Sequence, residues 1–273
     1  MRVGFIGLGS QGAPMARRIV EGGFPTTLWA RRPASVEPFA DTGAKVAGSP
    51  AELAAASDLV CLCVVGDDDV REVLSGDTGV LAGLAPGGIV AIHSTIHPDT
   101  CREVAEIAAA QGVSVIDAPV SGGGGAAEAG NLLVMVGGDA AVLERVRPVF
   151  ATFANPIVHL GDLGAGQITK LLNNLLFTAN LANAKTALDL GAALGVSPTS
   201  LAEVIGNGSG NSYALGSLAR VGGSLDLLKQ VAADLLHKDV GLVADIAERA
   251  GVTPGAVLDA ADAALVLLEK PRR

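Results

Sequence analysis

Residues 161–174 read GDLGAGQITKLLNN, a glycine-rich loop that passes into an apolar pattern of helical period. From Leu171 onward, leucines recur at the offsets of one helix face, and the pattern persists to about Gly195. At 1.5 Å of rise per residue, a helix of about thirty residues is roughly 45 Å long, which exceeds an ordinary globular helix. The stretch therefore predicts a long helix that bridges two parts of the molecule.

Composition narrows the classes of protein to which the chain can belong. It has 273 residues, 49% of them hydrophobic, which suits one large domain or two smaller ones with a sizeable core. A net charge of −9 argues against a nucleic-acid partner. No run of eighteen uncharged apolar residues occurs, so we expect no membrane span, and the start MRVGFIGLG is a poor signal peptide. The three cysteines are not spaced for zinc or for a disulfide framework, which favours a reducing cytoplasm.

The amino-terminal segment carries a candidate dinucleotide-binding loop. A short β-rich run, Arg2–Ile6, leads directly into a G-x-G-x-x-G pattern and then into a helical pattern. In such a loop the glycines allow a tight turn, close approach to a pyrophosphate and close packing of helix on strand, and the helix amides face the phosphates. The alternative is a turn that binds nothing. We expect cofactor contacts from Gly7, Leu8, Gly9, Ser10, Gln11 and Gly12.

The end of the second strand decides which dinucleotide is expected. The strand is predicted at Pro25–Trp29, and an acidic residue at its end would bind the adenine ribose of NAD. Ala30, Arg31 and Arg32 stand there instead, and guanidinium groups bind a 2′-phosphate bidentately. We therefore predict that the cofactor is NADP (NADPH), bound by Arg31 and Arg32, with NAD as the alternative cofactor. The alternative without a function is that both arginines are solvated loop residues.

Strands and helices alternate as far as residue 160, which is typical of a parallel sheet. In such sheets ligands bind beyond the carboxyl ends of the strands, so Val65 and Thr95 are further candidate cofactor contacts. The run Asp67–Asp69 lacks the alternating spacing of a calcium loop and is expected to start a helix, so we predict no metal site. Strands are predicted at Leu59–Val65, Ile89–Ile92, Val113–Asp117, Leu132–Val136 and Ile157–Leu160.

A serine followed by four glycines stands just past the strand expected to end at Asp117. The run Ser121–Gly125 offers one hydroxyl and several backbone amides, all of which can donate hydrogen bonds to a carboxylate. We therefore predict a small carboxylate-bearing substrate at this position, the alternative being a flexible linker.

The long helix and the residues after it supply further polar candidates. Lys170 and Asn174 lie one helical turn apart, an arrangement able to hold and protonate a substrate oxygen. Taken alone, that pair is better explained as surface residues, and so is Lys238. Helices are predicted for the rest of the chain at 198–205, 212–220, 232–249 and 254–269.

Four motifs in order, together with Lys238-Asp239, resemble the β-hydroxyacid dehydrogenase family over essentially the whole chain. The motifs are GLGSQGAPMA, HSTIHPDT, DAPVSGG and GDLGAGQITKLLNN. The family includes 3-hydroxyisobutyrate dehydrogenases, tartronate semialdehyde reductases and glyoxylate/succinic semialdehyde reductases. The resemblance implies an α/β Rossmann-type dinucleotide-binding domain at 1–162, an interdomain helix at 163–194 and an all-helical substrate and dimerisation domain at 195–273. It also implies a homodimer or homotetramer.

The resemblance further implies a role for each candidate residue. Hydride would pass between C4 of the nicotinamide and the carbinol carbon of a 3-hydroxy acid, or the equivalent aldehyde. Lys170 would be the general acid/base, Asn174 would hold the substrate and Lys238 would close over cofactor and substrate. The substrate carboxylate would be anchored by Ser121, Gly122 and Gly123.

Three other activities compete with this one. Imine reductases have a similar architecture but usually replace the catalytic lysine, so Lys170 argues against them. A catalytically silent NADP-binding module would more plausibly have lost Lys170 or Asn174. Decarboxylation like that of 6-phosphogluconate dehydrogenase is disfavoured because the larger C-terminal half of that enzyme has no counterpart in this sequence. Departures from the family pattern, such as Ala30, His93 and Val231, leave the identity of the substrate open.

Overall fold

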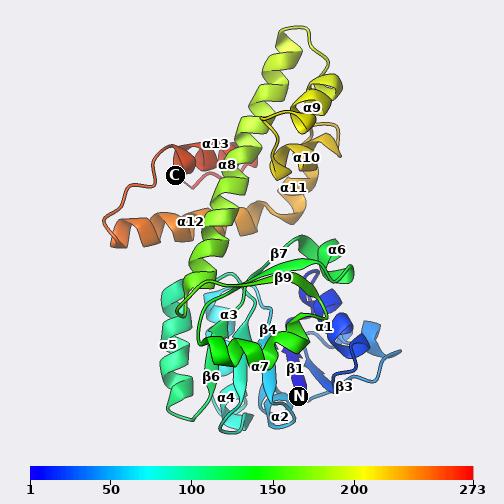
Figure 1. Ribbon diagram of the computed structural model, residues 1–273, viewed down its shortest axis with the longest axis vertical. Helices are drawn as coiled ribbons and strands as arrows, with labels where there is room; N and C mark the ends of the chain where they lie inside the picture. The colour runs from blue at the N-terminus through cyan, green and yellow to red at the C-terminus, as the bar shows by residue number, and fades with distance from the viewer. Residues whose placement is uncertain (273) are drawn as a thin grey trace. The chain divides into compact units, whose positions relative to one another are not determined.

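The computed structural model describes residues 1–272 of the chain. The chain forms two compact units, one from Met1 to Lys170 and one from Leu171 onward. The predicted long helix is α8 (Ala165–Ala193), which begins in the first unit and continues in the second (Figure 1). The boundary between the units thus falls inside α8, and the domain limits expected at residues 162 and 194 stay a prediction.

The first unit is built on a parallel sheet of six strands in the order β3-β2-β1-β4-β5-β6. The central strands are buried along their whole length, which explains why they are continuous apolar runs in the sequence. The order reverses between β1 and β4, and ligands bind at the carboxyl edge of a sheet at such a point. The strands are β1 (Val3–Ile6), β2 (Thr26–Trp29), β3 (Lys45–Val46), β4 (Leu59–Leu62), β5 (Ile89–Ile92) and β6 (Ser114–Asp117).

Successive side chains of the strands enter two hydrophobic cores, one on each face of the sheet. Phe5 packs with Met15 and Phe150 in one core, whereas its neighbour Ile6 packs in the other. The helix that begins at Pro50 is capped by Ser49, whose hydroxyl accepts a hydrogen bond from the Glu52 amide. The helices of this part are α1 (Gly12–Glu21), α2 (Pro50–Ala55), α3 (Asp67–Leu74), α4 (Val80–Gly83) and α5 (Pro98–Ala109), with short 3₁₀ turns η1 (Pro33–Ser35) and η2 (Glu37–Phe39).

A second sheet of three strands follows the first. β7 (Val120–Ser121) pairs antiparallel with β8 (Leu132–Val136), which pairs parallel with β9 (Ala154–His159). Helix α6 (Gly123–Glu128) connects β7 to β8, and α7 (Ala140–Phe150) connects β8 to β9. The strand at β8 has the predicted limits, whereas β7 was not among the predicted strands.

The second unit consists of helices packed around the length of α8 that follows Leu171 (Figure 1). Their shared core includes Leu175, Leu215, Leu236 and Leu265. The expected fold class, a Rossmann-type domain followed by an all-helical part, is confirmed. None of the helices among residues 1–272 is long and apolar enough to cross a membrane. The helices are α9 (Pro198–Asn207), α10 (Tyr213–Ala219), α11 (Asp226–Val231), α12 (Ala233–Arg249) and α13 (Ala256–Leu267), of which α11 was not predicted.

His93, just past the end of β5, is buried among aromatic rings. Its ring lies 5.2 Å from that of Phe150 and 5.7 Å from that of Phe153, centroid to centroid. Nδ1 is 2.8 Å from the carbonyl oxygen of Ala118, and Nε2 is buried without a hydrogen-bond partner among the described residues. Burial lowers the pKa of His93 from 6.5 to about 4. The imidazole is therefore a neutral core group at pH 7, with Nδ1–H donating to Ala118.

We expect His93 to make the folded state sensitive to acid. Because its pKa is lower in the folded state, its contribution to stability is complete above about pH 6.5 and is lost as the pH falls toward 4. The loss should reach about 3 kcal/mol of unfolding free energy. Urea unfolding at pH 7 and pH 4.5 measures it, and His93→Phe should remove most of the difference. The exposed His159→Gln is the control, and an equal acid sensitivity of both variants would contradict the assignment.

Candidate functional site

The loop between β1 and α1 has the geometry that its three glycines predict. Gly7 has a φ of +100°, and a β-carbon there would lie 2.2 Å from the Cys63 carbonyl oxygen. A β-carbon at Gly12 would lie 1.9 Å from the Gly7 carbonyl oxygen, so this position must be glycine for α1 to start against β1. At Gly9 a β-carbon would meet nothing within 4 Å. The middle glycine therefore faces open space, as close approach of a pyrophosphate requires.

Gln11 adds an unused hydrogen-bond donor at the same loop. Its Nε2 is buried and has no hydrogen-bond partner among residues 1–272. A buried amide nitrogen without a partner is costly, and a ligand oxygen would satisfy it. Together, the open face of Gly9 and this donor fit a phosphate-bearing cofactor.

A cavity of about 320 Å³ continues from this loop across the carboxyl ends of β1, β2 and β4. It brings together most of the predicted cofactor contacts, because it is lined by Gly7, Leu8, Gly9, Arg31, Arg32 and Val65. Trp29, Ser35 and Asp69 also line it. The cavity lies at the reversal of strand order, where the fold leads us to expect the adenosine half of a dinucleotide.

The two adjacent arginines of this cavity have different surroundings. The Arg31 guanidinium pairs with Asp69 and with Glu72 of α3, at 2.9 Å in each case. The Arg32 guanidinium has no hydrogen bond or ion pair among the described residues. Arg32 is thus available to an anion, whereas Arg31 already has two acidic partners.

The amino-terminal end of α8 is fixed by Asp117, the last residue of β6. The Asp117 carboxylate is fully buried and accepts hydrogen bonds from the backbone amides of Gly164 (2.6 Å) and Gln167 (2.7 Å). Burial raises the pKa of the Asp117 carboxyl, while these amides act in the opposite direction. A β-carbon at Gly137 or Gly166 would come within 2.7 Å of a carboxylate oxygen. Two glycines therefore make room for an acid that caps a helix from a neighbouring strand.

Gln167, in the first turn of α8, ties the helix to the segment that follows β5. Its Nε2 donates to the Ser94 carbonyl oxygen (2.8 Å), and its Oε1 accepts from the Ile96 amide (3.1 Å). Thr95 is the residue between these two contacts. Lys170 lies three positions after Gln167, hence on the same side of the helix, and it is only 9% exposed. The structure thus places the buried Lys170 on the helix face directed at the carboxyl end of β5.

The Ser121–Gly125 turn, which is predicted to bind the substrate carboxylate, contacts the dinucleotide-binding loop. Ser121 ends β7, Gly122 has a φ of +129°, and Gly123 begins the short helix α6. A β-carbon at Gly124 would lie 2.8 Å from the Ser10 carbonyl oxygen, so the two glycine-rich turns are in close contact. The glycines form a helical turn and not an extended loop, and the first amides of that turn have no intrahelical partner.

Asn174 and Lys238 belong to the second unit, where the carboxylate of Asp239 joins them. Asn174 Nδ2 donates to Asp239 Oδ2 at 2.6 Å, and Lys238 Nζ lies 3.0 Å from Asp239 Oδ1. Asp239 is only 3% exposed. Sequence reasoning missed the positioning roles of Asp117, Gln167 and Asp239.

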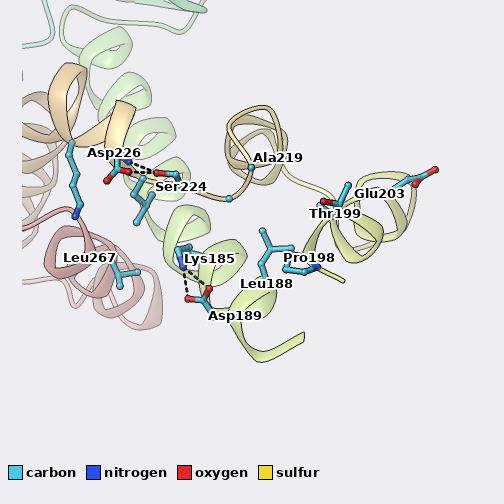
Figure 2. A pocket seen from close by; sticks show the side chains of 15 residues that line it. Lys185, Leu188, Asp189, Pro198, Thr199, Glu203, Ala219, Ser224, Asp226 and Leu267 are labelled. Carbon is cyan, nitrogen blue, oxygen red and sulfur yellow. Dashed lines mark hydrogen bonds and ion pairs between the residues drawn. The ribbon is translucent and has the colours of Figure 1, made fainter. Parts of the chain in front are cut away.

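A larger cavity, of about 700 Å³, lies in the second unit and contains none of the predicted site residues (Figure 2). Four of its polar side chains form two pairs, Lys185 with Asp189 (2.6 Å) and Ser224 with Asp226 (2.7 Å). Within residues 1–272, no group of three or more His, Cys, Asp or Glu side chains is arranged to hold a metal ion.

Two family models cover almost the whole chain. Residues 2–161 match the NAD binding domain of 6-phosphogluconate dehydrogenase. Residues 164–266 match the model described as NAD-binding of NADP-dependent 3-hydroxyisobutyrate dehydrogenase. The two matches meet at the loop that precedes α8.

The similar proteins and solved structures include several dehydrogenases. The chain is 36% identical over 253 residues to 2-(hydroxymethyl)glutarate dehydrogenase of Eubacterium barkeri, covering 92% of this chain and 84% of the relative. It is 35% identical to the NAD-dependent L-serine dehydrogenase of Pseudomonas aeruginosa, covering 90% and 85%. Among solved structures, Mycobacterium tuberculosis 3-hydroxyisobutyrate dehydrogenase with L-serine has a TM-score of 0.87 at 33% identity, covering 98% and 94%.

Imine reductases are more distant. The Streptomyces aurantiacus imine reductase has a TM-score of 0.70 and 20% identity, with 99% of this chain and 100% of that chain covered. At this level of identity the likeness shows a shared fold alone.

Substitutions at Gly9 and Gly12 should separate cofactor binding from folding. Gly9→Ala meets no atom within 4 Å, so the melting temperature should stay within about 2 °C. The added methyl group occupies the space of the pyrophosphate, so the dissociation constant for the dinucleotide should rise at least about tenfold. Quenching of Trp29, the single tryptophan, by NADPH or NADH measures it.

Gly12→Ala is the matched comparison. Its β-carbon collides with the Gly7 carbonyl oxygen, so the melting temperature should fall by about 5 °C. Unchanged dinucleotide affinity in Gly9→Ala, or a stable Gly12→Ala variant, would contradict this reading of the loop.

Proposed function

The chain belongs to the β-hydroxyacid dehydrogenase family, and from that membership we propose that it is an NADP(H)-preferring dehydrogenase of a small 3-hydroxy acid or reductase of the corresponding semialdehyde. Its fold and relatives are those of oxidoreductases that use a nicotinamide cofactor. In this proposal Lys170 is the general acid/base. The observation that carries it is the pair of Gln167 hydrogen bonds, which hold the Lys170 turn of α8 at the carboxyl end of β5.

The proposed cofactor site lies in the first unit. Gly7–Gly12 and the Gln11 amide are assigned to the pyrophosphate, and Val65 and Thr95 to the nicotinamide half. When bound, the nicotinamide supplies or accepts the hydride at C4. Preference for NADP(H) is proposed because Arg31 and Arg32 line the cavity and β2 ends without an acid.

The substrate is proposed to bind by its carboxylate to the turn at Ser121–Gly123, next to the dinucleotide loop. One hydroxyl and the free amides of the first turn of α6 can donate to both carboxylate oxygens. Lys170 then gives a proton to the carbonyl oxygen during reduction, or takes it from the hydroxyl during oxidation. Asn174 is assigned to the substrate and Lys238 to closure over cofactor and substrate, with Asp239 orienting both side chains.

We further propose a homodimer or homotetramer in the cytoplasm. Several large apolar side chains of the second unit are more than half exposed, including Leu194, Val204 and Tyr213. Exposed apolar surface on this scale is typical of a protein–protein interface. The three cysteines are free, as a reducing compartment requires.

Two other activities remain as alternatives to be tested. The first is imine reduction, which rests on fold similarity alone. The second is a catalytically silent NADP-binding module. A panel of small semialdehydes, 3-hydroxy acids and cyclic imines, with NADPH oxidation and NADP reduction as readouts, distinguishes them. Turnover confined to imines, or absent throughout, would refute the proposed activity.

Arg31→Ala tests the choice of dinucleotide. Removing one guanidinium from the proposed 2′-phosphate site should weaken NADPH binding about three- to tenfold, because a charge-assisted hydrogen bond is lost. NADH carries no 2′-phosphate and should bind almost as before. Trp29 quenching titrations give both dissociation constants, and equal changes for the two dinucleotides would refute the assignment of Arg31 to the 2′-phosphate.

Lys170→Ala tests the proton-transfer role. Turnover should fall by about 10² to 10⁴, the contribution of general acid–base catalysis, while the affinity for dinucleotide stays unchanged. Lys185→Ala, on the same helix but paired with Asp189 at 2.6 Å, is the control and should retain its turnover. Near-normal turnover in Lys170→Ala would exclude the role.

A further inference from the structure

The acidic partners of Arg31 come from a single helix that borders the cofactor cavity. Asp69 and Glu72 lie three positions apart on α3, and an oxygen of each is 2.9 Å from Arg31 Nη2. Asp69 also lines the cavity, with 26% of its side chain exposed. One nitrogen of the guanidinium therefore serves two carboxylates at the mouth of the proposed 2′-phosphate site.

These carboxylates oppose the binding of a 2′-phosphate in two ways. A phosphate that binds Arg31 must replace or share the Asp69 and Glu72 contacts. It must also approach two negative charges, and like charges a few ångströms apart repel one another. Arg32, which has no such partner among residues 1–272, is not affected in the same way.

We propose that Glu72 and Asp69 act as specificity-determining residues that hold Arg31 and thereby lower the preference of the enzyme for NADP(H) over NAD(H). This inference rests on the proposed function, in which the dinucleotide occupies this cavity. Glu72 is a positioning residue because it acts through Arg31 and does not line the cavity itself.

The exposure of the Arg31 and Glu72 side chains limits how strongly they change the preference between the two dinucleotides. The side chains of Arg31 and Glu72 are 60% and 68% exposed, and ion pairs this exposed are weak and screened by salt. The pair therefore adjusts the preference and does not abolish NADP(H) binding. The opposite possibility, that the carboxylates prepare Arg31 for the phosphate, predicts a change of the opposite sign.

Glu72→Gln tests the proposal by removing one charge while keeping the shape of the side chain. The measured quantity is the ratio of the dissociation constants for NADH and NADPH, from quenching of Trp29 at low ionic strength. The ratio should rise about two- to fivefold, and the rise should shrink in 0.5 M salt. Asp68→Asn is the matched control: it removes the same charge from the same helix, and Asp68 contacts Arg71 at 3.5 Å and not Arg31.

A double variant shows whether Glu72 acts through Arg31. In the Arg31→Ala background, the effect of Glu72→Gln should fall to the size of the Asp68→Asn effect. If Arg31→Ala lowers the ratio but Glu72→Gln leaves it unchanged or lowers it, this inference is wrong and the NADP(H) assignment stands. If Arg31→Ala itself leaves the ratio unchanged, Arg31 does not bind the 2′-phosphate and this inference fails, while the NADP(H) assignment then depends on Arg32. Melting temperatures within about 2 °C of the parent confirm that the variants are folded.

Discussion

The buried carboxylate of Asp117 is the contact on which the arrangement of the first unit depends. It receives the amides of Gly164 and Gln167 and so joins the end of β6 to the start of α8. A negative charge at a helix amino terminus is favourable, and the amide hydrogen bonds offset the cost of burying it. Because α8 begins at this fixed point, Gln167 reaches the end of β5 and Lys170 follows one turn later. The position of the proposed acid/base thus derives from an aspartate more than fifty residues earlier in the sequence.

Local features of the sequence predicted much of the fold. The G-x-G-x-x-G loop and the strands at β5 and β8 depend on residues close together in the chain, so their patterns are readable without the fold. The long helix was predicted for the same reason. Elements of only a few residues were missed, such as the exposed β3 and the short α11, because two to six residues are too few to establish a period.

The contacts between distant residues could not be read in this way. Asp117 to Gln167 spans 50 residues and Asn174 to Asp239 spans 65, and a polar residue in the sequence does not reveal its partner. His93 is a further example. As a sequence feature it is a departure from a family pattern, whereas in the structure it fills a space between phenylalanine rings and donates to Ala118. Tertiary packing, and not local propensity, decides what such a residue does.

The electrostatic field in the cofactor cavity is set by nearby groups and not by the net charge of the chain. The chain has a net charge of −9, yet it is expected to bind an anionic dinucleotide. Screening over about 8 Å at physiological ionic strength limits the influence of distant carboxylates. What acts on the ligand is its immediate surroundings, which include the glycine-rich loop with the nearby Gln11 amide, the two arginines and Asp69. Those arginines are neighbours in the sequence but not equivalents, because α3 brings Asp69 and Glu72 to Arg31 and leaves Arg32 to the ligand. The two adjacent arginines in the sequence predict that a phosphate can bind here, and the ion pairs from α3 determine which of them is ready to bind it.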